Sequence, residues 1–351
     1  MEFVFTEEQT MIAETVRGFF VENAGSERTR KAMEGEGIDR TLWSAFCTEL
    51  CLSGIGVPEE MGGAGLGLLE LAIVAESAGA QVAAIPLLGH AMVARALVAG
   101  GSAQQQAHYL PRLIAGEMIA AYAAAPAVED RDGALNAVAQ FVAHGAVADV
   151  FLVASDDRAW MVERGAEGVM VEGHVTMDQT RPLATLTLSG AAGELLADGA
   201  AGVVAAEQAG WLVLAAEALG AAQQALDTTV AYAKERVQFG RAIGSFQAYK
   251  HRLADIMVAI EQARSAVYWA GCAVDEGADE AVIALHSAKA FCGDTAFMAA
   301  ANMIQLHGGI GFTWEHDAHL YFKRARSILS MLGSSDWHRE QIACAILGEA
   351  A

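Results

Sequence analysis

The chain has 351 residues, of which 54% are hydrophobic and 19% are charged, with 22 lysines and arginines against 43 aspartates and glutamates. This length allows two or three domains and a large core. The net charge of −21 repels nucleic acids and anionic membranes, so both are poor partners. No uninterrupted apolar run reaches the length of a membrane span, and Met1–Phe5 lacks the basic and apolar regions of a signal peptide.

The five cysteines show no CxxC pair and no zinc spacing. Cys47 and Cys51 are four residues apart, so we expect them to share one face of a helix. Buried, unpaired thiols suit a reducing compartment, which predicts a cytoplasmic protein. The remaining cysteines are Cys272, Cys292 and Cys344.

Residues 1–125 are expected to form an amino-terminal helical domain. Thr6, followed by Glu7, Glu8 and Gln9, is typical of a capped helix start with acidic groups in its first turn. A glycine-rich loop over 61–67 needs backbone freedom. Apolar periodicity predicts further helices over residues 42–52, 68–79 and 90–99.

The middle of the chain changes character, and we expect a small β domain over residues 126–196. Its strand candidates are short β-favouring runs bounded by Gly, Asp and Asn. They are Gln140–Ala143, Val150–Ala154, Ala159–Val162 and Leu183–Leu188.

Residues 197–351 are expected to return to helices. One apolar stripe runs at three- and four-residue steps from Leu212 through Leu219 to Ala233. Later helices are predicted from about Phe246 to Asp275, from Glu280 to Gln305, and from about Trp337. The fold class is therefore mainly α with a small central β domain.

Two motifs stand out in this last region. Arg236 is followed by Phe239 and Gly240, with Gln247 eleven residues after the arginine; Gln305 is followed by Gly308 and Gly309. Arginine makes forked contacts with phosphates, glutamines offer hydrogen bonds, and glycines let a backbone approach a ligand closely. A Gly-Gly after a helix alone is usually a helix cap. The order and spacing of all the elements argue against coincidence.

These motifs, with Val57–Gly65 near the start, resemble the acyl-CoA dehydrogenase family. The resemblance implies an amino-terminal helical domain, a β domain and a carboxyl-terminal four-helix bundle. It also implies that Arg236, Phe239, Gln247, Gln305, Gly308 and Gly309 contact the FAD of a neighbouring subunit. Acyl-CoA as substrate and an electron-transfer flavoprotein as electron acceptor follow from the same resemblance. A basic cluster would attract these anionic groups to the acidic chain: Arg236, Arg241, Lys250, His251 and Arg252.

The parts that the family uses for its own chemistry are missing. Its catalytic glutamate is replaced by Leu332 at the usual position, and by Gly210 at the position used in a minority of members. Glu207 and Glu217 are the nearest carboxylates on that helix. Glu217 projects away from the Leu219 stripe, so a solvated or interface carboxylate fits both better than a base.

The loop that begins the family's β domain is also altered. The segment Tyr122–Gly133 holds neither a Thr-Glu-Pro nor a Gly-Ser-Asp sequence, and no flavin-facing tryptophan pair is recognisable. Near the second glycine motif, Gly311–Tyr321 mixes acidic and imidazole groups, with His316 among them. These do not make a defined ligand set, so no metal is expected.

Three hypotheses follow. The retained and missing parts resemble the paired α2β2 acyl-CoA dehydrogenases of bacterial steroid and related side-chain breakdown, which predicts a subunit that completes its partner's FAD site without supplying the base. The alternative is a homotetrameric dehydrogenase with a relocated base at Glu207 or Glu217. A third possibility is a flavin-free scaffold or binding protein with the same fold.

Overall fold

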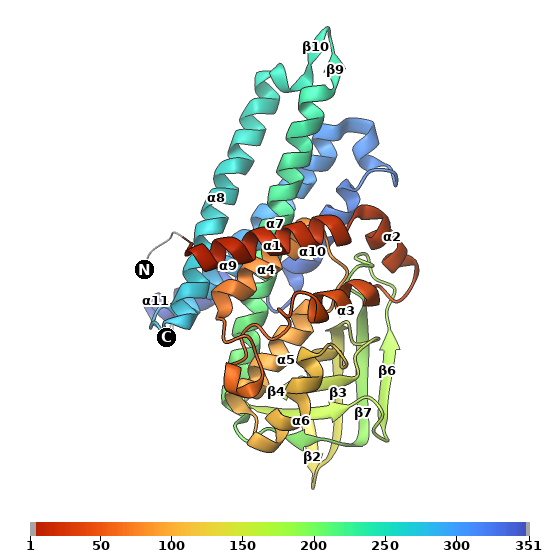
Figure 1. The fold of residues 1–351 in the computed structure, drawn as a ribbon, viewed down its shortest axis with the longest axis vertical. Coiled ribbons are helices and arrows are strands. Elements are labelled where there is room, and N and C mark those ends of the chain that lie inside the picture. The colour runs from red at the N-terminus through yellow and green to blue at the C-terminus, as the bar shows by residue number, and fades with distance from the viewer. Residues whose placement is uncertain (1–4, 349–351) are drawn as a thin grey trace. The chain divides into compact units, whose positions relative to one another are not determined.

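The computed structural model describes residues 5–348; Met1–Val4, on which most of the signal-peptide assessment rested, lie outside the described residues. The chain packs as two compact units. The helical unit comprises Met1–Ser26, Ala72–Ala83 and Trp211–Ala351, and the mixed unit comprises Glu27–Leu71 and Ala84–Gly210. The expected mainly α fold with a central β region is confirmed (Figure 1). The division into three domains at 125/126 and 196/197 stays a prediction.

The mixed unit combines short helices with two sheets. Its helices are α2 (Ser26–Glu34), α3 (Arg40–Thr48), η1 (Glu59–Met61), α5 (Leu87–Gly100) and α6 (Ala103–Ile114). Its strands are β1 (Ala120–Ala124), β2 (Val128–Arg131), β3 (Ala134–Ala143), β4 (Val150–Ser155), β5 (Arg158–Glu163), β6 (Val169–Gly173), β7 (Leu183–Ala192) and β8 (Glu194–Leu195). Helix α4 (Leu68–Ala80) and helix α7 (Gly199–Glu235) pass from one unit into the other.

The eight strands form two four-stranded sheets, in the orders β1-β4-β5-β8 and β2-β3-β7-β6. Strands β1 and β4 are parallel, with Ala120 opposite Val150, and the remaining pairs are antiparallel. Strand β4 is buried along almost its whole length, which explains its unbroken run of apolar residues. All four expected strands lie within β3, β4, β5 and β7.

Strand β1 corrects the expectation that residues up to 125 are helical. Alanine favours helices, but Ala120–Ala124 pairs with β4 and is packed beneath α5. A methyl group at Gly89 of α5 would lie only 2.5 Å from the carbonyl oxygen of Ala120. This non-local pairing overrides local propensity, which is weak by comparison with tertiary packing.

Helix α3 is shorter than expected and ends at Thr48, with Glu49 as its carboxyl cap. Cys51 therefore lies beyond the helix at φ +56° and is exposed, whereas Cys47 is buried inside it. The prediction that these two thiols share a helix face was wrong.

The helical unit contains the long helices of the fold (Figure 1). Its elements are α1 (Glu7–Asn23), β9 (Val237–Gln238), β10 (Arg241–Ala242), η2 (Ile243–Ser245), α8 (Gln247–Asp275), α9 (Ala281–His307), η3 (Gly308–Phe312), α10 (Ala318–Ser330) and α11 (Ser335–Leu347). Helix α1 begins with the expected capping box between Thr6 and Gln9. Helix α9 packs against α8, α10 and α11.

Helix α10 was not among the expected helices. Its buried positions include Leu320, Tyr321, Arg324 and Ile328, which follow a helical spacing. An arginine on this buried face interrupts the apolar pattern, so hydrophobic periodicity alone misses the helix.

Helix α7 is long and apolar enough to cross a membrane by length and composition. In the structure, 67% of its most apolar window is buried within the protein. Every residue from Trp211 to Ala222 is buried. Helix α7 is therefore a buried core helix.

Helices α4 and α7 approach each other backbone to backbone inside the helical unit. A methyl group at Gly220 would overlap the carbonyl oxygen of Glu76, and one at Gly79 would overlap the backbone of Glu217. Because both obstacles are backbone atoms, neither can move without shifting a helix. Only glycine fits at these two positions.

We therefore expect Gly220→Ala to destabilise the protein. Overpacking costs about 1–3 kcal/mol, against a gain of about 1 kcal/mol in helix propensity. Thermal unfolding should show a lower midpoint. Gly18→Ala in α1 is the control, because nothing lies within 4 Å of the added methyl group; it should leave the midpoint unchanged or raise it. Equal midpoints for the two variants would contradict the proposed backbone contact.

Candidate functional site

One end of the helical unit holds an open cavity of about 430 Å³. It lies where α7 gives way to the β9–β10 hairpin and where α9 ends in η3. Among the predicted FAD contacts, Arg236, Gly308 and Gly309 line it directly. The other lining residues are Tyr232, Gln238, Ile243, Tyr249, Leu306, His307 and Ile310.

The remaining predicted contacts, Phe239, Gln247 and Gln305, are exposed but do not line this cavity. Phe239 is 92% exposed at the tip of the hairpin that joins α7 to α8 (Figure 1). Phe239 and Gly240 both have positive φ angles, +55° and +77°, as tight two-residue hairpins require. A bulky residue in this conformation is strained, and such strain is concentrated at functional sites.

Two tyrosines brace the cavity. Tyr249 donates a hydrogen bond from its hydroxyl to the carbonyl oxygen of Leu306 at 2.9 Å, and Tyr232 donates to that of His307 at 3.3 Å. Both carbonyls belong to the last turn of α9, where helix carbonyls lack partners of their own. These bonds tie α7 and α8 to the start of the glycine loop.

His307 is a buried part of this wall. Its Nδ1 lies 2.7 Å from the carbonyl oxygen of Met303, and its ring stacks on Tyr232 with centroids 4.4 Å apart. Burial lowers the pKa of His307. A neutral ring with its proton on Nδ1 satisfies this arrangement, so His307 is a wall residue of the cavity.

The chemistry of the cavity fits an anionic, phosphate-bearing ligand. The Arg236 guanidinium has no hydrogen-bond or ion-pair partner within residues 5–348. Gly308 has φ +63°, and added methyl groups at Gly308 or Gly309 would meet nothing within 4 Å. The other members of the basic cluster, Arg241, Lys250, His251 and Arg252, are also exposed. An arginine donor beside an open glycine backbone suits the pyrophosphate of FAD.

Exposed apolar side chains lie on the β9–β10 hairpin and on η3, the segments that contribute to the cavity. The rim, as we call it, consists of Val237, Phe239, Ile310 and Phe312, which are 56%, 92%, 47% and 87% exposed. Clustered exposed apolar side chains mark interaction sites. This end of the helical unit therefore has an unpaired arginine in a cavity and exposed apolar side chains nearby.

At the usual position of the family's catalytic base, Leu332 is half-buried in the loop between α10 and α11. Its backbone is left-handed at φ +52°, and its carbonyl oxygen accepts a hydrogen bond from the Trp211 indole at 3.0 Å. The buried Lys289 ammonium donates to the carbonyl oxygens of Ile328 at 2.9 Å and Gly333 at 3.3 Å. At the alternative position, Gly210 is buried within α7. Neither position can accept a proton.

Glu217 is not the solvated or interface carboxylate that we expected. It is 3% exposed, and its Oε1 lies 3.9 Å from Nη1 of Arg324, which is 1% exposed. The prediction from the apolar stripe failed because α7 is buried on all sides at this point. A side chain that faces away from the Leu219 stripe is therefore still inside the protein. Glu217 and Arg324 form a buried ion pair, and each charge depends on the other.

Glu207 is half-buried in the mixed unit. The Tyr122 hydroxyl donates a hydrogen bond to its Oε1 at 3.4 Å, and burial raises the pKa of Glu207. A carboxyl group with a raised pKa is a general acid–base candidate.

The segment in place of the family's β-domain loop has its own internal bonding. Asp130 accepts hydrogen bonds from Arg158 at 2.9 Å and from the Trp160 indole at 3.1 Å. Arg158 also lies over the Trp160 ring, 4.5 Å from its centre. The buried Trp160 thus links β5 to β2 through its hydrogen bond with Asp130. Among residues 5–348, no group of three or more His, Cys, Asp or Glu side chains could hold a metal ion.

Sequence reasoning missed a buried polar cluster beside the Leu332 loop. His286 and His338 face each other with their Nδ1 atoms 2.7 Å apart, next to Lys289. One Nδ1 must carry a proton and donate while the other accepts, so at least the accepting ring is neutral. Burial lowers the pKa of both, that of His338 to about 3 with the help of Lys289 and His286. The two histidines are 52 residues apart, so no local pattern reveals them.

This pair predicts acid sensitivity. The histidines titrate near pH 6.5 in the unfolded chain but at lower pH in the folded one, so the unfolded state binds more protons in between. Stability should be full above about pH 6.5 and fall below it, by up to about 1.4 kcal/mol per pH unit for each histidine. Denaturant titrations at pH 7.5 and 5.0 measure the loss. His338→Gln should make it smaller, and an unchanged loss would contradict the assignment.

The comparisons with known proteins agree with this architecture. Residues 6–117 match the family model "Acyl-CoA dehydrogenase, N-terminal domain", and residues 199–347 match "Acyl-CoA dehydrogenase, C-terminal domain". The chain is 39% identical over 330 residues to the acyl-CoA dehydrogenase IpdE2 of Mycobacterium tuberculosis, covering 93% of this chain and 94% of that protein.

Two solved complexes share the fold. The ChsE4–ChsE5 complex from Mycobacterium tuberculosis has a chain with 28% identity and a TM-score of 0.88, and the alignment covers 100% of both chains. A variant of the Tcur3481–Tcur3483 steroid ACAD has a chain with 30% identity and a TM-score of 0.87, with 97% of this chain and 98% of that one covered. This chain belongs to the acyl-CoA dehydrogenase family.

Proposed function

We propose that this chain is a subunit of a cytoplasmic, FAD-dependent acyl-CoA dehydrogenase complex that completes the FAD site of a second, base-bearing subunit. The observation that carries the proposal is a contrast within the helical unit. Arg236, Gly308 and Gly309 line an open cavity, whereas Leu332 stands at the position where the family usually has its catalytic base. The related ChsE4–ChsE5 and Tcur3481–Tcur3483 structures are each named for two chains, which supports a complex of two different subunits; the α2β2 stoichiometry is part of the proposal.

In this proposal each residue has a limited role. Arg236 would bind the FAD pyrophosphate with its forked donors, Gly308 and Gly309 would let the backbone approach it, and Gln247 and Gln305 would offer hydrogen bonds from the flanking helix ends. The exposed Phe239 would pack against the partner. When bound, FAD supplies the hydride acceptor for α,β-dehydrogenation of an acyl-CoA thioester to the trans-2-enoyl-CoA. The substrate class is a steroid or related side-chain thioester, with an electron-transfer flavoprotein as the electron acceptor.

Arg236→Gln tests the shared site. The chain is co-produced with a second acyl-CoA dehydrogenase chain that has both the glutamate and the β-domain loop, and flavin per complex is read from the visible spectrum. Loss of a charge-assisted contact costs about 1.5–3 kcal/mol, so FAD affinity should fall about 10- to 100-fold. Lys234→Gln, the same charge change two residues earlier at an exposed position outside the cavity, should have little effect.

Flavin content of the chain alone separates the proposals. A colourless chain that turns yellow only with its partner supports the shared site. About one FAD per chain in an active homotetramer would overturn it.

The second candidate is a homotetrameric dehydrogenase with Glu207 as the relocated base. The half-burial and raised pKa of this carboxyl favour it. Glu217 is the weaker choice, because its proton-accepting capacity is committed to Arg324.

Under this second candidate, Glu207→Gln should abolish the bleaching of bound flavin by an acyl-CoA while leaving FAD in place. Tyr122→Phe, which removes the hydroxyl donor, should shift the pH at which bleaching is half-maximal. Bleaching by Glu207→Gln at the wild-type rate would exclude Glu207 as the base.

A further inference from the structure

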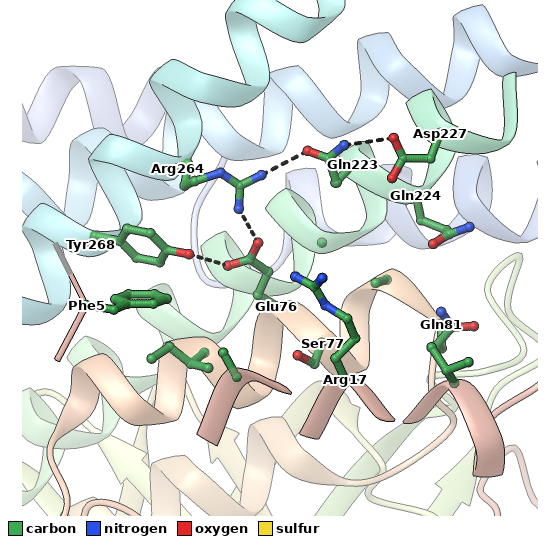
Figure 2. Close-up of a pocket in the computed structure, with 15 residues that line it drawn as sticks. Phe5, Arg17, Glu76, Ser77, Gln81, Gln223, Gln224, Asp227, Arg264 and Tyr268 are labelled. Carbon is green, nitrogen blue, oxygen red and sulfur yellow. Dashed lines mark hydrogen bonds and ion pairs between the residues drawn. The ribbon is translucent and has the colours of Figure 1, made fainter. Parts of the chain in front are cut away.

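A second cavity, of about 420 Å³, lies within the helical unit among α1, α4, α7 and α8 (Figure 2). None of the residues of the family's motifs lines it. Its size is within the range of small-molecule sites. We propose that this cavity binds a small organic oxyanion, such as a carboxylate or a phosphate ester with an apolar body.

One wall of the cavity is a polar network whose side chains are paired with one another by hydrogen bonds and an ion pair. One carboxylate oxygen of Glu76 pairs with Arg264, and the other accepts a hydrogen bond from Tyr268 at 2.9 Å. Arg264 also donates to Gln223 at 2.9 Å, and Gln223 donates to Asp227 at 3.0 Å (Figure 2). The charges of Glu76 and Arg264 offset each other, and Asp227 is a further acidic group on this wall.

Three other polar side chains of the cavity lining have no side-chain hydrogen bond or ion pair within residues 5–348. The exposed Arg17 of α1, Ser77 of α4 and Gln81, which follows the end of α4, all line the cavity (Figure 2). All three offer donors: a guanidinium, a hydroxyl and an amide. Hydrogen-bond donors that line one cavity together with an unpaired guanidinium favour an oxyanion as the ligand.

The remaining lining is apolar and implies a body attached to the anion. Phe5 packs against Tyr268 with ring centroids 4.8 Å apart, and Ala13, Val21 and Ile73 line the cavity as well. Inorganic phosphate would contact only the donors, whereas an organic oxyanion would also cover this apolar surface. The chain carries a net charge of −21, so the guanidinium of Arg17 is the uncommitted group of this cavity that would attract an anion.

Phenyl phosphate and benzoate serve as probes, with inorganic phosphate as the anion alone, each titrated against the full chain and followed by protein NMR shifts or calorimetry. We expect phenyl phosphate and benzoate to bind at least tenfold more tightly than inorganic phosphate. Arg17→Gln should weaken both by at least tenfold. The matched control is Arg326→Gln, because Arg326 is exposed on α10, outside the cavity.

Ala13→Leu fills the cavity without changing charge, and it should also abolish binding while the circular dichroism spectrum is kept. Equal binding by wild type and Arg17→Gln would overturn the proposal. Equal affinities for inorganic phosphate and phenyl phosphate would overturn the assignment of an organic ligand. Because these titrations need neither flavin nor a partner subunit, their failure is separate from failure of the proposed function.

Discussion

The close approach of α4 and α7 is the constraint on which much of the helical unit depends. Gly79 and Gly220 remove side chains where the two backbones meet. The approach fixes where Glu76 and Glu217 must lie, because both are neighbours of the contact on the same helices. Both carboxylates therefore lie inside the protein, where a charge needs a partner. Arg264 pairs with Glu76, and Arg324 pairs with Glu217. Charges that look dispersed in the sequence are thus consequences of one packing contact.

The Leu332 loop is held in place through its backbone. Its backbone is held by Trp211 at the Leu332 carbonyl and by Lys289 at the Ile328 and Gly333 carbonyls. None of these hydrogen bonds involves the side chain at position 332. Loss of a glutamate there would remove the proton acceptor without releasing the loop. The hydrogen bonds of this loop therefore do not depend on which side chain stands at position 332.

The sequence was most informative where function is carried by short, ordered motifs. The spacing from Arg236 to Gly309 predicted a ligand-binding end, and the structure brings Arg236, Gly308 and Gly309 to one cavity. Prediction failed where non-local contacts decide. Strand β1 exists because of a parallel partner 30 residues later, and helix α10 was hidden by Arg324 on its buried face.

The prediction for Glu217 failed for the same reason, because its burial depends on non-local contacts. A one-sided stripe assumes one buried face, whereas α7 is covered all round at this point. The paired histidines 286 and 338 could not be found at all, because only tertiary packing brings them within 2.7 Å. Buried polar groups thus depend on partners that local sequence does not specify.

Under the proposed function, the rim near the Arg236 cavity would connect assembly with cofactor binding. Val237, Phe239, Ile310 and Phe312 leave apolar surface in water when the chain is alone, and Phe239 also holds a strained backbone. Burial of apolar surface contributes about 25 cal/mol per Å², so a partner that covers the rim would stabilise the folded state. Under the proposed function, the same partner brings the flavin to Arg236. Anything that binds only the assembled form shifts the equilibrium toward assembly, so FAD and the partner subunit would each strengthen the binding of the other.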